Sequence, residues 1–478
     1  MHLLEASIEV IQDLQADGTV TAVDLVQFYL DRIAQHDDKL NSIQTINTRA
    51  LSVAQALDRE RAKSGPRTLL HGIPVLVKDN YETVGMATNN GSALFEGFAP
   101  ERDAHLVERL KAAGAIILGK TTMHEFAFGI TTVGSAFGAT RNPYNTDRNP
   151  GGSSGGTGAA VAANFAVAGM GSDTCGSIRI PAAHNNLVGL RGTQGLSSRR
   201  GIVPLSSTQD IGGPLAKSVR DLAIILELTV GYDSEDSQTA ESVGGDFRYA
   251  DKLAERSDIR IGVLSAHTQQ EAPDAEVARV VRAALSAVSE SANWHIQEVA
   301  SPELDAALDR RANGNFVLVA DFKTDIEAYL AANPELGFND LAALLAQGKH
   351  HPHIEGALNA ALATTEAMPQ AYFVEMAQRR HVRRALLSIM AKHNLDALAY
   401  PTIRRTAVAV GEALQPGTNC QLSANSGLPA ITVPAGFSNE MPVGLELLAE
   451  PWSEQKLLDL AFTVERHHPQ RRPPASTP

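Results

Sequence analysis

From about residue 70 onward, short apolar runs alternate with segments of helical spacing. The runs HGIPVLVKDN at 71–80 and GAIILG at 114–119 are typical of buried strands, and residues 102–112 between them are predicted to be helical. Strand character returns in LDALAYP and PAITVPAG near the end of the chain. This alternation predicts an α/β fold. We expect a single large domain with a central mixed β-sheet covered by helices on both faces.

Three parts of the chain differ from this pattern. The first 65 residues are predicted to be helical. Residues 232–260 are polar and residues 270–395 are mostly helical in pattern, so we expect a variable helical insertion over about 232–395. The last stretch, 467–478, holds four prolines and is predicted to be a disordered tail. The domain itself would then cover residues 1–466.

Charge and cysteine content exclude several classes of partner. The chain has 41 Lys and Arg against 54 Asp and Glu, a net charge of −13, which argues against nucleic acid and anionic membranes as partners. No run reaches the roughly 20 apolar residues that span a bilayer, and the N-terminus lacks the pattern of a secretory signal. The only cysteines, Cys175 and Cys420, suit a reducing compartment. We expect a cytoplasmic protein.

Several local patterns suggest chemistry, but each has a plainer interpretation. The phosphate-loop pattern at 114–121 has an apolar middle like a strand. The nucleophile-elbow pattern at 151–155 follows a proline-broken loop instead of a strand. A Cys175–His184 nucleophile pair has only proximity in its favour. We expect no cofactor and no metal, because Pro352 splits the one group of potential ligands, which is His350, His351, His353 and Glu355.

Three pieces of the sequence carry a stronger signal together than any one carries alone. Lys78 ends an apolar run, Ser153 and Ser154 lie in the glycine-rich segment NPGGSSGGTG, and Ser177 lies in GSDTCGSIRIPA. In this order they resemble the amidase signature family of Ser-Ser-Lys amide hydrolases. The resemblance covers most of the chain, from TAVDLVQFYL near its start to PVGLELLAE near its end.

The resemblance implies a role for each of these side chains. Ser177 would be the nucleophile, Ser153 the bridging serine after a cis peptide bond, and Lys78 the base. A lysine must be neutral to accept a proton, and burial in an apolar strand lowers its pKa. Cys175 stands where the family commonly has glycine, so it could restrict the loop or narrow the acyl pocket. Backbone N–H groups of one turn would bind the oxyanion, namely those of Thr174, Cys175, Gly176 and Ser177.

The resemblance implies an amidase that hydrolyses a small carboxylic amide to an acid and an amine or ammonia. An alternative is the A subunit of a tRNA-dependent amidotransferase, which has a similar length and the same triad. A non-catalytic or nucleotide-binding protein is disfavoured because all three catalytic positions are filled. Arg179 either binds an acidic substrate or is a buried structural charge, and we favour the second role. Pocket residues are expected from the variable region and near Thr402 and Gln421, and a homo-oligomer stays open.

Overall fold

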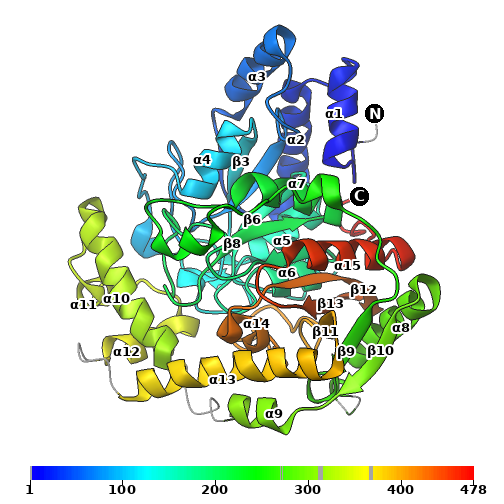
Figure 1. Cartoon of the computed structure of the whole chain (residues 1–478). Coiled ribbons are helices and arrows are strands. Elements are labelled where there is room, and N and C mark those ends of the chain that lie inside the picture. Colours follow the sequence, from blue (N-terminus) through cyan, green and yellow to red (C-terminus); the bar gives the residue numbers. More distant parts are fainter. Residues whose placement is uncertain (1–2, 270, 272, 310–315, 365–369) are drawn as a thin grey trace.

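A mixed sheet of 11 strands runs through the centre of the computed structural model, which describes residues 3–478 except 270, 272, 310–315 and 365–369. Helices lie on both faces of this sheet (Figure 1), which confirms the predicted α/β fold. In spatial order the strands are β1 (Ile43–Ile46), β3 (Ile116–Thr121), β2 (Pro74–Lys78), β6 (Ala168–Ser172), β8 (Gly212–Ala216), β7 (Val188–Arg191), β12 (Ala430–Ser438), β13 (Met441–Leu448), β11 (Ala397–Pro401), β9 (Arg260–Leu264) and β10 (His295–Val299).

The remaining elements are helices, short 3₁₀ turns and one small hairpin. The helices are α1 (Ile8–Ala16), α2 (Ala22–Leu40), α3 (Ala50–Ser64), α4 (His105–Ala112), α5 (Gly155–Ala162), α6 (Arg179–His184), α7 (Val219–Thr229), α8 (Ala275–Ala292), α9 (Pro302–Asp309), α10 (Phe316–Ala332), α11 (Leu341–Leu345), α12 (Glu355–Leu362), α13 (Gln370–His393), α14 (Gln421–Ser426) and α15 (Glu454–His467). The 3₁₀ turns are η1 (Ala93–Phe95), η2 (Glu125–Ala127), η3 (Ser237–Ser242), η4 (Ala250–Lys252), η5 (Ser265–His267), η6 (Pro334–Leu336) and η7 (Pro352–Ile354), and the hairpin pairs β4 (Val133–Gly134) with β5 (Gly138–Ala139). Within the described ranges, none of the helices combines the length and apolarity needed to cross a bilayer.

Local signals in the sequence explain where the first helices begin and end. Thr21 caps α2, because its hydroxyl accepts a hydrogen bond from the Asp24 N–H at 3.0 Å while the Asp24 carboxylate accepts one from the Thr21 N–H at 2.9 Å. This reciprocal pair satisfies N–H groups that lack helical partners. Asn41 ends the helix in the left-handed conformation. The turn leads into β1, a strand that the sequence did not predict and that pairs antiparallel with β3.

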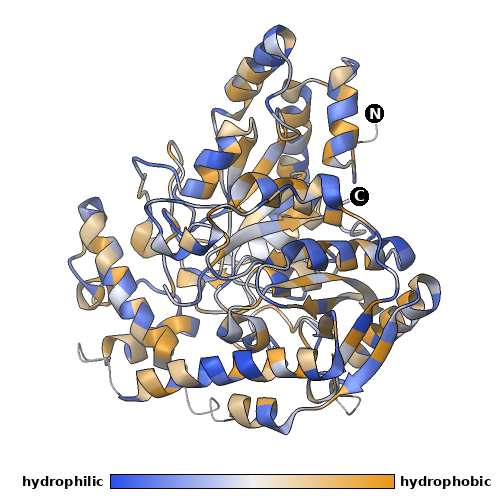
Figure 2. Cartoon of the chain, viewed as in Figure 1, coloured by the Kyte–Doolittle hydropathy of each residue, from blue (hydrophilic) through white to orange (hydrophobic). Residues whose placement is uncertain are grey.

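The strands that carry the candidate site are buried along their whole length. All residues of β2 and β3 are buried, as parallel strands covered on both faces are, and Figure 2 shows hydrophobic residues along the central strands. The phosphate-loop pattern lies within this core. A Cβ atom at Gly119 would come within 2.5 Å of the Thr45 carbonyl oxygen, and Lys120 forms an ion pair with Asp79 at 3.4 Å. This pattern is therefore strand β3 and not a phosphate-binding loop.

The segment predicted as a helical insertion, about 232–395, also contributes to the sheet. Its strands β9 and β10 pair parallel with each other, and β9 pairs parallel with β11. Ile261, Val263 and Leu264 on β9 are buried, so a short apolar run there completes the sheet instead of forming a separate helical layer. The prediction of a purely helical insertion is corrected accordingly, while α10 to α13 do form the expected helical part (Figure 1).

The last residues of the chain, predicted to be disordered, pack against its beginning. The Arg471 guanidinium donates a hydrogen bond to Glu5 at 2.7 Å, and Arg32 on α2 donates one to the Thr477 carbonyl oxygen at 2.9 Å. The two ends of the chain lie side by side in Figure 1. Proline-rich composition suggested disorder, but a buried ion pair with residues more than 400 positions away orders the tail, and composition carries no sign of such a partner.

Candidate active site

Lys78 and Ser153 are in direct contact at the carboxyl end of β2. The Lys78 side chain is fully buried, and its ammonium donates hydrogen bonds to Ser153 Oγ at 2.7 Å and to Ser172 Oγ at 2.8 Å. Ser172 ends β6, the parallel neighbour of β2. The two strands therefore deliver their last side chains to the same edge of the sheet, where α/β folds commonly place their sites.

The serine pair lies in a loop that leads directly into α5. The peptide bond between Gly152 and Ser153 is cis, as the resemblance implied. A Cβ atom at Gly155 would come within 2.2 Å of Thr132 Oγ1, so the glycine there permits close packing. The element before the loop is not a strand, and α5 begins only at Gly155. The segment 151–155 is therefore not a nucleophile elbow.

Ser177 lies beside this pair, in the turn between β6 and α6. Its carbonyl oxygen accepts a hydrogen bond from the Ser154 N–H at 3.3 Å, which holds the turn against the glycine loop. Ser177 also lines a pocket of about 300 Å³. The three side chains that the sequence singled out are thus brought together, with Lys78 and Ser153 behind and Ser177 at the pocket wall.

Burial changes the ionisation of Lys78. Removal from water disfavours the charged ammonium and lowers the pKa of Lys78 from 10.5 to about 7, although the negative charges of Asp210 and Asp173 act in the opposite direction. A lysine with this pKa is neutral in a large fraction of molecules at neutral pH. It can then accept a proton from Ser153, to which it is already hydrogen-bonded.

The predicted oxyanion turn has fewer open N–H groups than expected. The Gly176 N–H donates to Asp173 Oδ1 at 2.7 Å, so in this arrangement it does not point at a substrate. In the described structure no hydrogen bond uses the N–H groups of Thr174, Cys175 or Ser177. We therefore correct the predicted set of donors by removing Gly176, because the Asp173 carboxylate occupies its N–H group.

Asp173 is the centre of a buried charge network behind this turn. Its carboxylate accepts hydrogen bonds from Arg179 Nε and Arg191 Nη1, both at 3.1 Å. Burial alone would raise the pKa of Asp173, but Arg179 and Arg191 hold it well below its usual range. Arg179 also pairs with Glu446, and its side chain is fully buried. Arg179 therefore has the structural role that the sequence favoured, and it does not reach the pocket.

Arg179→Met is expected to destabilise the fold. The change leaves Glu446 buried without its cation, and breaking a buried pair from one side costs about 3–5 kcal/mol. Chemical denaturation followed by circular dichroism would measure this loss. Arg404→Met, at a partly exposed pair with Asp274, is the matched control and should change the free energy of unfolding by less than about 1 kcal/mol. Equal effects of both changes would contradict the structural role.

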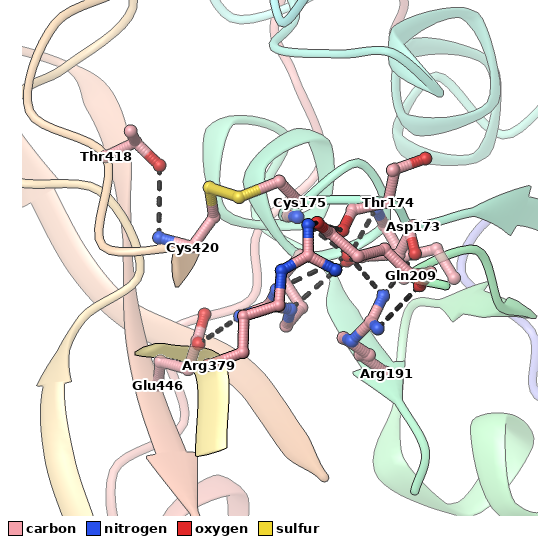
Figure 3. The surroundings of a disulfide bond; sticks show 12 residues. Asp173, Thr174, Cys175, Arg191, Gln209, Arg379, Thr418, Cys420 and Glu446 are labelled. Carbon is pink, nitrogen blue, oxygen red and sulfur yellow. Dashed lines mark hydrogen bonds and ion pairs between the residues drawn. A yellow bond between two sulfur atoms is a disulfide. The ribbon is translucent and has the colours of Figure 1, made fainter. Parts of the chain in front are cut away.

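The two cysteines are joined to each other. A disulfide links Cys175 in the oxyanion turn to Cys420 just before α14 (Figure 3). This overturns the expectation of unpaired thiols, and it removes the Cys175–His184 nucleophile pair, since a disulfide sulfur is no nucleophile. His184 instead lies 3.3 Å from the Arg405 carbonyl oxygen through its Nε2. The cysteines are 245 positions apart, a separation at which sequence alone gives no sign of contact.

The histidine group proposed as a metal candidate is not a metal site. Among the described residues, no cluster of three or more His, Cys, Asp or Glu side chains could hold a metal ion. The His351 N–H donates to the Glu125 carboxylate at 2.8 Å, and His351 Nδ1 accepts from the His353 N–H at 3.2 Å. These contacts shape the turn η7.

The pocket beside Ser177 is lined without any charged side chain in the described part of the chain. Its walls come partly from the variable region, as expected, and Gln421 was also anticipated. Sequence reasoning missed the segment after η2 and the loop before β8, because neither carries a motif of its own. The lining residues are Ala127, Phe128, Gly129, Ile130, Thr174, Cys175, Ser177, Leu205, Gln209, Leu318, Val319, Ala357, Thr418, Cys420 and Gln421.

Sequence reasoning also missed the polar residues that support the triad. Ser172 contacts Lys78 directly, and Asn80 Nδ2 donates to Ser172 Oγ at 3.0 Å. Asp210 accepts a hydrogen bond from Thr174 Oγ1 at 2.5 Å. One signal for Ser172 and Asp173 was available, because both lie in the stretch GSDTCGSIRIPA that contains Ser177.

Comparisons with known proteins agree with this site. The Amidase family model matches residues 24–458. The A subunit of glutamyl-tRNA(Gln) amidotransferase from Marinomonas sp. (strain MWYL1) is 32% identical over 97% of this chain and 97% of that protein. The structure of native peptide amidase from Stenotrophomonas maltophilia superposes with a TM-score of 0.91 at 34% identity, over 99% of each chain. For the A subunit of glutamyl-tRNA(Gln) amidotransferase from Thermotoga maritima the TM-score is 0.78 at 28% identity, over 98% of this chain and 97% of that chain. The chain therefore belongs to the amidase family of amidase signature enzymes, which act on amide C–N bonds.

Proposed function

We propose that this protein is a stand-alone amidase that hydrolyses a small carboxylic amide through an acyl-enzyme on Ser177. The observation that carries the proposal is the 2.7 Å hydrogen bond between the buried Lys78 ammonium and Ser153 Oγ, beside a pocket that Ser177 lines. A base of lowered pKa, a relay hydroxyl and a hydroxyl at a pocket wall are the groups that serine-based acyl transfer needs.

The proposed reaction has two halves. Neutral Lys78 takes the proton of Ser153, and Ser153 takes that of Ser177, so that Ser177 Oγ bonds to the carbonyl carbon of the amide. Open N–H groups of the turn stabilise the negative oxygen that develops. The relay then runs in reverse: the C–N bond breaks and the leaving nitrogen receives the proton. Water attacks the acyl-enzyme by the same route and releases the acid.

The pocket favours an uncharged, largely apolar acyl group. Phe128, Leu318 and Val319 are among its walls, and in the described residues no Lys or Arg lines it to pair with a carboxylate. An unpaired charge moved into such a pocket would lose its hydration without compensation. The polar side chains Gln209 and Gln421 could orient a neutral amide.

A second candidate is the A subunit of a tRNA-dependent amidotransferase. The relative from Marinomonas has a name of that kind and matches nearly the whole chain. The higher TM-score to a peptide amidase, 0.91 against 0.78, and the uncharged pocket favour the stand-alone enzyme. Partner subunits belong only to the second candidate.

The compartment stays a prediction. The sequence-based expectation is the cytoplasm, whereas the Cys175–Cys420 disulfide is more typical of oxidising compartments. Fractionation of the native host followed by thiol labelling of the protein would decide between them.

The test uses the protein purified alone. We expect acid and ammonia or amine from at least one neutral amide in a panel of aliphatic, aryl and peptide C-terminal amides, and little turnover of free glutamine. Hydrolysis of glutamine alone, or activity only after addition of partner subunits, would favour the second candidate. A folded protein inactive on every amide would contradict both.

Ser153→Ala is expected to lower kcat by roughly 10²- to 10³-fold, because the relay to Lys78 is lost while a water can partly replace it. Ser154→Ala is the matched control in the same loop. The Ser154 hydroxyl bonds only to main-chain groups of Ser172, at 3.2 and 3.3 Å, so its loss should cost less than about tenfold. A larger loss in Ser154→Ala would reverse the assignment within the pair.

A further inference from the structure

The disulfide lies closer to the reacting hydroxyl than a purely structural bond requires. Cys175 is two residues before Ser177, and both cysteines line the same pocket as Ser177. Figure 3 shows the bond crossing between two separate parts of the chain, the turn after β6 and the segment before α14. The pocket is therefore closed at this point by a covalent link between two walls.

Hydrogen bonds hold the other residues of the turn but not Cys175. The Thr174 carbonyl oxygen accepts from Gln209 Nε2 at 2.9 Å, and Asp173 holds the Gly176 N–H. The main chain of Cys175 takes part in no hydrogen bond with the described residues. In that part of the chain, the disulfide to Cys420 is thus the connection that fixes this residue.

Cys420 is a suitable anchor for the turn. Its N–H donates to Thr418 Oγ1 at 3.1 Å, and its side chain packs in a small buried cluster with Ile180 and Ile403. A Cβ atom at Gly176 would lie 2.8 Å from Cys420 Cβ, so this anchor rests directly on the turn. Movement of the 418–421 segment is therefore transmitted to the N–H groups next to Ser177.

We propose that the Cys175–Cys420 disulfide positions the oxyanion turn for catalysis, and that its reduction by a small dithiol lowers turnover. The proposal rests on the proposed function. In the reduction the S–S bond breaks and two S–H groups form, while the dithiol gives up two electrons and two protons and becomes a disulfide itself. Cys175 and Cys420 act through the turn and are positioning residues, since neither is the nucleophile.

The experiment compares the oxidised protein with the same protein after native-buffer treatment with dithiothreitol. Thiol titration should find no free thiol before treatment and two after it. We expect kcat to fall roughly ten- to a hundredfold, because displacements of about 1 Å at a reacting group have effects of this size, while KM changes less. The pH midpoint should stay the same, since the Lys78 contacts to Ser153 and Ser172 do not involve the cysteines. Oxidised glutathione should restore the rate.

The double variant Cys175→Ser/Cys420→Ser is the matched control. It should have the low kcat of the reduced enzyme and should not respond to dithiothreitol. Unchanged kcat after two thiols appear, two free thiols in the protein as isolated, or a loss of rate that only follows global unfolding by circular dichroism would each overturn the proposal.

A second readout separates this proposal from the proposed function. A fluorophosphonate phosphonylates an activated serine without any amide turnover, and its phosphoryl oxygen would use the same N–H groups. Labelling of Ser177 should slow by a similar factor upon reduction. If the oxidised protein hydrolyses no amide but its labelling slows on reduction, the proposed function fails and the positioning role stands. Equal labelling rates in both states would overturn the positioning role.

Discussion

Ser177→Ala is expected to abolish amide turnover while leaving the fold intact. The proposed mechanism has one atom that bonds to the substrate carbonyl carbon, Ser177 Oγ, and a methyl group cannot replace it. In serine hydrolases of other folds, loss of the nucleophile costs roughly 10⁴- to 10⁶-fold in kcat. The side chain lines the pocket instead of filling the core, so the melting temperature should change little.

The measurement is single-turnover hydrolysis with mass spectrometry of the protein. The parent enzyme should accumulate a mass increase equal to the acyl group, and Ser177→Ala should not. Substantial hydrolysis by the folded variant, or an acyl group found on another residue, would contradict the assignment of the nucleophile.

Lys78→Met is expected to have the second largest effect, with a fall in kcat of roughly 10³-fold or more, because the base of the relay is lost. Methionine fills the buried space without adding a charge or an unpaired donor. Lys78→Arg should also fail, since a guanidinium stays protonated. Steady-state kinetics of both variants on one amide provides the test, and full activity of Lys78→Met would exclude Lys78 as the base.

The pH dependence provides a further test of Lys78. Activity requires the neutral amine, so kcat/KM should rise about tenfold per pH unit below a midpoint near 7, where the pKa of Lys78 lies, and level off above it. Unfolded chains keep the ordinary lysine pKa of 10.5 and bind more protons between these values. The free energy of unfolding should therefore rise across this range in the parent, and this contribution should be absent in Lys78→Met.

Two histidines serve as controls against a histidine triad. His71 Nε2 lies 3.0 Å from the Leu57 carbonyl oxygen, and burial lowers the pKa of His184 to about 4. Neither lines the pocket. Replacing either by Gln should leave kcat within severalfold of the parent if the variant folds. A collapse of kcat in one folded His variant together with an active Lys78→Met would replace the lysine mechanism by a histidine one.

The sequence by itself determined the fold class, the family and the positions of the three proposed catalytic side chains. Each of these depends on short-range order along the chain. Apolar runs such as the one ending at Lys78 predict buried strands, and the glycine-rich loop before α5 requires residues without a Cβ atom. The structure brings Lys78, Ser153 and Ser177 together as expected, and their roles remain predictions for the variants to test.

Only the tertiary structure decided the features that depend on long-range contacts. The Cys175–Cys420 bond spans 245 positions, Arg179 reaches Glu446, and Arg471 orders the tail through Glu5. It also showed that Asp173 occupies the Gly176 N–H group, which a motif cannot reveal. Local patterns report the conformation that a segment prefers, whereas the partner of a buried charge or thiol is set by which distant segments the packed sheet places beside it.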